Sequence, residues 1–349
     1  MKRTLAFILS IIMLLGILTG CQNTVPAQTT EATATAPTQS PEEQEILKVL
    51  TIGNSHSLDA TRMLFEVFQK EAPEQKLVLG TLYYSGCNMS QHAKFISEDS
   101  AVYEYYKNEN GNWNTMKEAT VKLALMDEQW DVVVMQQMNH RVGIEDNYVA
   151  KDYKDVIEFV NSYVKEPSSL AFHITWTNPS DYALYLDDNA PLNNPDPTSW
   201  RNQHEDWYGG ADGKYDQNQM YLKVIEKVQK YLVDTTEFLG ENYYDMMISS
   251  VTAVEYAQDV CGLTQEQVYR DYTHLNDYGR LLVGYLWYAQ LMGLEKLETV
   301  KVDAIPANLH HQNSVYPAMP DYAITQDLKD VIVESVNWTL AHPYELPAK

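Results

Sequence analysis

ILKVLTIGNS, residues 46–55, begins as an uninterrupted run dominated by apolar side chains and ends in three small or polar residues. An apolar run of this length, rich in β-branched side chains, is typical of a strand buried on both faces of a parallel sheet. Apolar residues then recur at helical spacing between Ala60 and Phe68, and we expect Asp59 to cap that helix. The stretch therefore predicts a strand, a tight turn and a helix in succession.

The same succession of strand and helix repeats along the rest of the chain. Four further apolar runs predict strands, at residues 76–84, 131–135, 170–175 and 246–248. Helices are predicted at residues 155–163, 217–239, 277–292 and 327–340, and an aromatic hairpin at residues 102–114. This alternation predicts an α/β fold, a three-layer α/β/α sandwich around a five-stranded parallel sheet. We assign residues 46–349 to one domain.

One connection in this domain is unusually long. Residues 177–215 are rich in aromatic and amide side chains, and loops of this length are commonly functional or disordered. The aromatic rings would suit the face of a sugar, or they would form a small local core that seals the insertion. The sequence leaves these two interpretations open.

The N-terminal segment has the composition of a targeting signal followed by a flexible linker. Two basic residues precede an apolar run, residues 5–18, that is short for a membrane-spanning helix. The run leads into Leu-Thr-Gly-Cys ending at Cys21, which resembles the lipobox of bacterial lipoproteins. The resemblance implies a signal peptide at residues 1–20 and a lipid on Cys21. Residues 21–45 then predict a flexible linker, and we expect the protein to be secreted and held on the outer face of the bacterial cell membrane.

The charge balance narrows the range of partners. The chain carries 25 Lys and Arg against 48 Asp and Glu, a formal net charge of −23. This excess argues against nucleic acid, which binds basic surfaces, and against adsorption to an anionic membrane. We therefore expect membrane contact only through the N-terminal lipid. Three cysteines are too few for a disulfide scaffold, and the sequence leaves a bond between Cys87 and Cys261 open.

Polar residues follow the predicted strands at the edge where parallel sheets bind ligands. Ser55 follows the first strand, Gly86 the second and residues 136–139 the third, while Asp271 and His274 come after the fifth. A serine hydroxyl is a weak nucleophile without a base, and His274 is the candidate base. Asp271, three residues earlier, could hold the imidazole in the required tautomer. The pattern predicts that Ser55, His274 and Asp271 are catalytic.

The same loops hold candidates for an oxyanion hole. The backbone N–H groups of Ser55 and Gly86 could bind the developing negative charge, together with an amide side chain after the third strand. By position this amide belongs to Gln137 or Asn139, with Gln136 as an outsider.

The order of these residues resembles the SGNH (GDSL-type) hydrolases over roughly residues 46–292. The resemblance rests on GNSHSLDA (residues 53–60), Gly86, the Asn/Gln cluster and DYTHLNDYGR (residues 271–280). It implies a flavodoxin-like sheet and a serine esterase in which Ser55 is the nucleophile and Asp271 and His274 complete the triad. The start of the motif is most similar to an uncharacterised bacterial branch of the family. The third block departs from the family's Gly-x-Asn-Asp, because residues 137–140 read QMNH.

Neither a metal nor another cofactor is expected. We expect His56, His92 and His140 to lie in strand-end loops, but none of these histidines has the i, i+4 partner of a zinc protease. We interpret them as polar lining of the loops.

Together these patterns predict an extracytoplasmic, lipid-anchored serine esterase that removes O-acyl groups, acetyl in particular, from a carbohydrate. Its partner would be a small-molecule or glycan ester. One alternative is a catalytically silent SGNH-like lipoprotein that binds a glycan. Another is the solute-binding lipoprotein of a transporter, although that class usually needs two similar lobes and the sequence predicts a single run of five strands.

Overall fold

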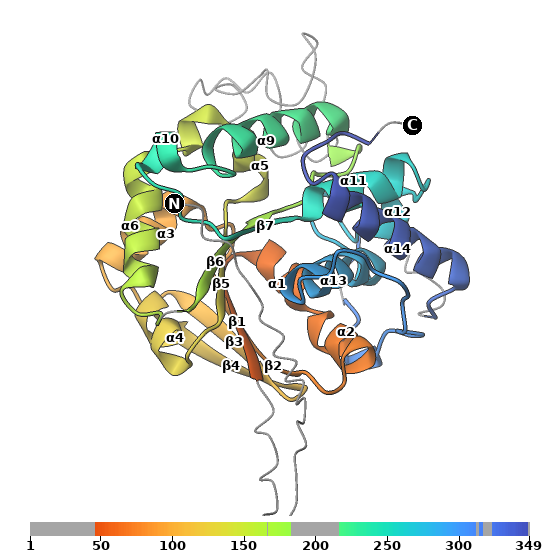
Figure 1. The fold of residues 1–349 in the computed structure, drawn as a ribbon, viewed down its shortest axis with the longest axis horizontal. Coiled ribbons are helices and arrows are strands. Elements are labelled where there is room, and N and C mark those ends of the chain that lie inside the picture. Colours follow the sequence, from red (N-terminus) through yellow and green to blue (C-terminus); the bar gives the residue numbers. More distant parts are fainter. Residues whose placement is uncertain (1–45, 166, 183–215, 312–313, 317–322, 348–349) are drawn as a thin grey trace, which may run out of the picture. The chain divides into compact units, whose positions relative to one another are not determined.

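Seven strands form one sheet in the computed structural model, which describes residues 46–165, 167–182, 216–311, 314–316 and 323–347 (Figure 1). The strands are β1 (Ile46–Gly53), β2 (Lys76–Tyr83), β3 (Tyr103–Glu109), β4 (Asn112–Ala119), β5 (Val132–Gln136), β6 (Ser169–Ile174) and β7 (Met246–Ser249). Their order across the sheet is β4-β3-β2-β1-β5-β6-β7.

The five predicted parallel strands are confirmed, and the predicted hairpin extends their sheet. β2, β1, β5, β6 and β7 pair in parallel, whereas β3 and β4 pair antiparallel at the outer side of β2. Taken in chain order, the parallel strands lie 2-1-3-4-5, the flavodoxin-like order. The crevice of such a sheet lies beyond the carboxyl ends of the first and third parallel strands, here β1 and β5.

Helices cover both faces of the sheet, which completes the predicted three-layer sandwich (Figure 1). One face carries α1 (Ser55–Thr61), α2 (Leu64–Glu71), α11 (Ser250–Asp259), α12 (Gln265–Val268), α13 (Asp277–Leu291) and α14 (Gln326–Ala341). The other carries α3 (Met89–Ser97), α4 (Val121–Asp127), α6 (Ala150–Asn161), α9 (Gln217–Tyr231) and α10 (Thr236–Leu239). Shorter turns include α5 (Asn139–Val142), η1 (Glu145–Asn147) and η2 (Ala307–Leu309). No helix among these described segments is both long enough and apolar enough to cross a membrane.

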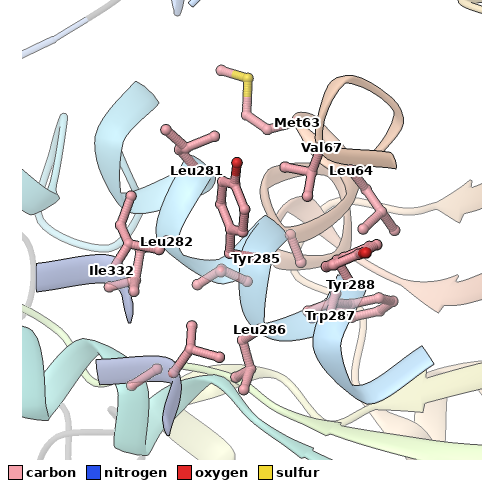
Figure 2. Packing of buried hydrophobic residues seen from close by; sticks show 14 of the residues in the cluster. Met63, Leu64, Val67, Leu281, Leu282, Tyr285, Leu286, Trp287, Tyr288 and Ile332 are labelled. Atoms are coloured by element: carbon pink, nitrogen blue, oxygen red, sulfur yellow. The ribbon is translucent and has the colours of Figure 1, made fainter. Parts of the chain in front are cut away.

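The most extensively buried helix is α13, and its packing fixes the loop that precedes it. Figure 2 shows apolar side chains of α13 facing those of α2 and α14, with Tyr285 and Trp287 among the buried rings. Met63 and Val67 lie against the same helix. Burying a large apolar side chain contributes about 1.5–3 kcal/mol, so this contact holds α13 firmly against the helices that follow β1.

Two helix predictions are wrong in detail. Asn54, not Asp59, caps the first helix, because the side chain of Asn54 accepts from a backbone N–H of α1 whereas Asp59 lies within that helix. The helix predicted at residues 217–239 is interrupted: Asp234 accepts the backbone N–H of Thr236 and starts α10 as a separate turn.

The two described cysteines are free. Cys87 is buried and Cys261 is half-buried, so the disulfide that the sequence left open is not formed. Of the predicted aromatic insertion, residues 183–215 lie outside the described part of the chain, as do the predicted signal peptide, Cys21 and the linker up to residue 45.

Candidate active site

The loops predicted to carry the chemistry meet at one edge of the sheet. Ser55 begins α1 directly after β1, and Gly86 lies in the loop that leaves β2, the parallel neighbour of β1. Gln137 follows β5, the neighbour of β1 on its other side. Asp271 and His274 lie in the loop between α12 and α13, which the packing of α13 places beside α1.

Ser55, His274 and Asp271 form a continuous hydrogen-bonded chain. Ser55 Oγ lies 2.8 Å from His274 Nε2, and His274 Nδ1 lies 3.0 Å from both carboxylate oxygens of Asp271. This is the geometry of a nucleophile, a base and an orienting carboxylate. The side chains of His274 and Asp271 keep 24% and 28% of their surface exposed, so the chain of groups is open to a substrate.

Asp271 is held as a carboxylate by its own loop. Its Oδ1 accepts the backbone N–H groups of Thr273 and His274, at 2.9 and 2.8 Å. Burial opposes ionisation, but the hydrogen bonds from the ring of His274 and from the two backbone N–H groups outweigh it and lower the pKa of Asp271. An ionised acceptor at Nδ1 directs the Nε2 lone pair toward Ser55.

The turn before Ser55 requires its two preceding residues. A Cβ at Gly53 would lie 2.2 Å from Ser57 Oγ and 2.8 Å from Gln136 Cγ, so only glycine fits there. Asn54 accepts the backbone N–H of His56 at 3.0 Å, and its Nδ2 donates to the carbonyl of Cys87, also at 3.0 Å. Asn54 therefore joins the start of α1 to the loop that contains Gly86.

The two backbone N–H groups predicted for the oxyanion hole belong to the turns that follow two neighbouring strands, β1 and β2. No described residue accepts a hydrogen bond from the backbone N–H of Ser55 or of Gly86. Gly86 has a φ of +60°, a left-handed conformation that favours glycine and turns the backbone of this loop.

The three candidate amides are all buried and engaged with other parts of the protein. Gln136 accepts from Ser57 Oγ at 2.7 Å. Gln137 accepts the backbone N–H groups of Met89 and Met138, and its own NH2 group makes long contacts at 3.4 and 3.5 Å. Asn139 donates to Asn178 at 2.7 Å. These bonds assign none of the three amides to the oxyanion.

An aromatic support behind His274 was not predicted from the sequence. The ring of His56 lies 4.7 Å from that of Trp176 and 5.5 Å from that of His274. Trp176 Nε1 donates to the carbonyl of Thr273 at 2.8 Å. Burial, followed by the proximity of the His274 ring, keeps the pKa of His56 well below its ordinary value, so His56 is neutral near pH 7.

A buried charge cluster beneath the loop was also missed. Asp59 Oδ1 accepts from Arg280 Nη2 at 2.7 Å and from Arg270 Nη1 at 2.9 Å, and Oδ2 accepts the backbone N–H of Leu275 at 3.1 Å. Burial opposes its ionisation, but Arg280 and Arg270 hold the pKa of Asp59 well below its usual range. A carboxylate among the apolar positions of the first helix was the signal available in the sequence.

The histidines considered for a metal lie in the helices α1, α3 and α5 rather than in the predicted loops, and they have separate partners. His92 Nδ1 bonds Tyr103 Oη at 2.8 Å, and His56 Nδ1 faces Asn54. His140 stacks against the ring of Tyr182. Within the described ranges, no three metal-ligating side chains gather in one place.

One family model matches the part of the chain that contains Ser55 and Gly86. The model of a family described as a domain of unknown function (DUF4886) matches residues 48–187. This range contains Ser55 and Gly86 but ends before Asp271 and His274. No curated protein sequence matches the chain.

Comparisons of the structure support the fold. A DUF4886 family protein from Bacteroides uniformis is 22% identical over 87% of this chain and 98% of its own, with a TM-score of 0.62. A candidate SGNH hydrolase from Slackia heliotrinireducens is 15% identical over 71% of this chain and 100% of its own, with a TM-score of 0.43. A gut microbial diltiazem-metabolizing enzyme is 10% identical over 71% of this chain and 47% of its own, with a TM-score of 0.39. Only the first likeness is strong enough to bear on the fold.

Proposed function

We propose that this protein is an SGNH-like serine esterase. The observation that carries the proposal is the chain of hydrogen bonds from Ser55 through His274 to Asp271, at the sheet edge where flavodoxin-like folds bind ligands. A serine bonded to a histidine that a carboxylate orients is suited to acyl transfer.

The reaction would run through an acyl-enzyme. Ser55 Oγ attacks the ester carbonyl while His274 Nε2 takes the hydroxyl proton, and the backbone N–H groups of Ser55 and Gly86 bind the oxyanion. The tetrahedral intermediate collapses, and His274 returns the proton to the departing alkoxide, which leaves as an alcohol. Water then attacks the acyl group while His274 takes one of the water's protons, and His274 returns this proton to Ser55 Oγ as the carboxylic acid leaves.

The substrate class is proposed as an O-acylated, chiefly O-acetylated, carbohydrate outside the cytoplasm. The lipobox-like sequence at Cys21 supports the location, which is a lipid-anchored position on the outer face of the cell membrane. The aromatic and amide composition of residues 177–215 supports the sugar. A catalytically silent glycan binder shares both features, but a serine and a histidine already at 2.8 Å favour the enzyme.

Turnover of an activated acetyl ester by wild type and by Ser55→Ala tests the reaction. We expect hydrolysis by the wild type and a loss of several orders of magnitude in the variant. Acetate release from O-acetylated polysaccharides then tests the substrate. The wild type could instead bind such a glycan, release no acetate and leave the activated ester unhydrolysed. That result would favour the catalytically silent glycan binder over the esterase.

A further inference from the structure

One buried carboxylate connects the two halves of the proposed site. Asp59 lies on α1, the helix that Ser55 begins, and its side chain is only 2% exposed. Its partners all come from the segment that carries the base: Arg270 precedes Asp271, Leu275 follows His274, and Arg280 lies on α13.

We propose that Asp59 is a positioning residue for the reaction, one that sets the reach of His274 to Ser55 and whose negative charge stabilises the imidazolium formed in each step. The inference rests on the proposed esterase function. It assigns Asp59 no contact with the substrate.

The geometric part follows from which atoms Asp59 binds. The backbone N–H of Leu275 is bonded to Asp59 Oδ2 at 3.1 Å, and this N–H is adjacent in the chain to His274. Arg270 Nη1 bonds both Asp59 and the carbonyl of Leu275. The His274 backbone is therefore clamped to the helix that presents Ser55, and displacing a catalytic group by about 1 Å can cost about 10²-fold in rate.

The electrostatic part follows from the charges that surround this carboxylate. Arg270 and Arg280 face Asp59, and Arg270 Nε also lies 3.8 Å from Asp271 Oδ2. The positive charges of Arg270 and Arg280 oppose protonation of the His274 imidazole. The negative charge of Asp59 offsets one of these two positive charges. The other groups that face this region are Arg62 at the end of α1, Asp277 on Arg280 and His311 on Asp277.

His274 has its own set of charged or titratable neighbours. Asp271 comes from the same loop, His56 from α1 and His140 from α5. Because burial holds the pKa of His56 well below its ordinary value and lowers the pKa of His140 to about 4, both are neutral near pH 7. The negative charges that interact with His274 are then those of Asp59 and Asp271.

The test compares three variants of the whole protein by kcat, KM, pH profile and thermal melting. Asp59→Asn keeps an oxygen for Leu275 but loses the charge. We expect kcat to fall about 10²-fold with KM changed only a few-fold. We also expect the acid limb of kcat/KM to move down by about one pH unit, because the imidazolium loses a nearby negative charge.

Arg280→Gln removes a positive charge from the same cluster and should move the acid limb in the opposite direction, to higher pH. It leaves the pair of Asp59 with Arg270 in place, so it serves as the test if Asp59→Asn fails to fold. Asp277→Asn is the matched control: Asp277 is equally buried and also binds Arg280, but its other partner is His311. Its acid limb should stay within about 0.3 pH unit of the wild type.

An acid limb that moves in neither Asp59→Asn nor Arg280→Gln would overturn the inference and leave Asp59 a structural residue. Asp59 would also be only structural if Asp59→Asn loses no more kcat than Asp277→Asn. A wild type that neither turns over esters nor reacts at Ser55 would instead remove the proposed function, and with it the reaction that Asp59 is inferred to serve.

Discussion

Asp271→Asn should disable the site while leaving the loop folded, for a reason visible in the hydrogen bonds. Asp271 Oδ1 accepts both backbone N–H groups of the loop, from Thr273 and His274, and an asparagine oxygen can keep these two bonds. The other carboxylate oxygen, 3.0 Å from His274 Nδ1, becomes an NH2 group. The new NH2 group opposes a proton on Nδ1 and leaves the asparagine oxygen as the single acceptor there, so the imidazole moves its proton to Nε2.

The changed tautomer of His274 prevents the activation of Ser55. With a proton on Nε2, His274 can no longer accept the hydroxyl proton of Ser55 across their 2.8 Å contact. A change of this kind lowers kcat by about 10⁴-fold in a serine triad. The free energy of unfolding should fall by only about 1 kcal/mol, which corresponds to a melting temperature lower by a few degrees.

The assay is turnover of an activated acetyl ester by Asp271→Asn, His274→Ala and the double variant, with thermal melts alongside. Because the two residues act on the same step, the double variant should be little worse than His274→Ala alone. Asp277→Asn is the control, since Asp277 binds Arg280 and His311 rather than His274. Near wild-type turnover by Asp271→Asn, or losses that multiply in the double variant, would refute the triad.

Three further predictions concern packing, anchoring and acid stability. Gly53→Ala should destabilise the fold by about 1–3 kcal/mol and impair turnover, because the new Cβ would overlap Ser57 and Gln136; an unchanged melting temperature would contradict this packing. Cys21→Ser should abolish lipidation and membrane retention, as measured by mass spectrometry and cell fractionation, whereas an unmodified wild-type N-terminus would exclude the anchor. Burial lowers the pKa of His92 to about 3, so its neutral form stabilises the fold above pH 6.5 and this contribution is lost as the pH falls toward 3. His92→Gln should therefore make the acid decline in the free energy of unfolding shallower by up to about 1.4 kcal/mol per pH unit, and equal slopes in the two proteins would refute the assignment.

The sequence predicted the central sheet because its signal is local. Buried parallel strands are short apolar runs, and the runs at residues 46–52, 131–135 and 170–175 each became a strand. The hairpin was predicted too short, since β4 continues to Ala119 through residues that are largely exposed and carry no apolar pattern. An edge strand whose side chains are mostly exposed has a weaker apolar pattern in the sequence than a buried strand.

The sequence predicted the parts of the site that depend on residues close together in the chain. Gly53 through Ser55 lie at the end of a strand, and Asp271 lies three residues from His274, so both spacings could be recognised in the sequence. The role of Asp59 was not, because its partners Arg270 and Arg280 lie 211 and 221 residues away. The local pattern predicted that Asp59 caps a helix, whereas in the fold Asp59 is a buried carboxylate paired with two arginines.

The choice of an amide for the oxyanion hole also depends on contacts between residues far apart in the chain. Gln137 and Asn139 were both suitable by position, but their side chains bond Met89 and Asn178, residues that only the folded chain brings near. Which amide, if any, joins Ser55 and Gly86 depends on these tertiary bonds rather than on the motif.

The most direct test of the central claim is where a fluorophosphonate probe attaches to the folded protein, as read by mass spectrometry of its peptides. Ser55 is half-buried and bonded to His274 at 2.8 Å, whereas Ser57, two residues on, is 2% exposed and donates to Gln136. We predict a single adduct on Ser55 that persists in Ser57→Ala and disappears in Ser55→Ala and His274→Ala. An adduct on Ser57, or a folded wild type that takes up no probe, would contradict the account.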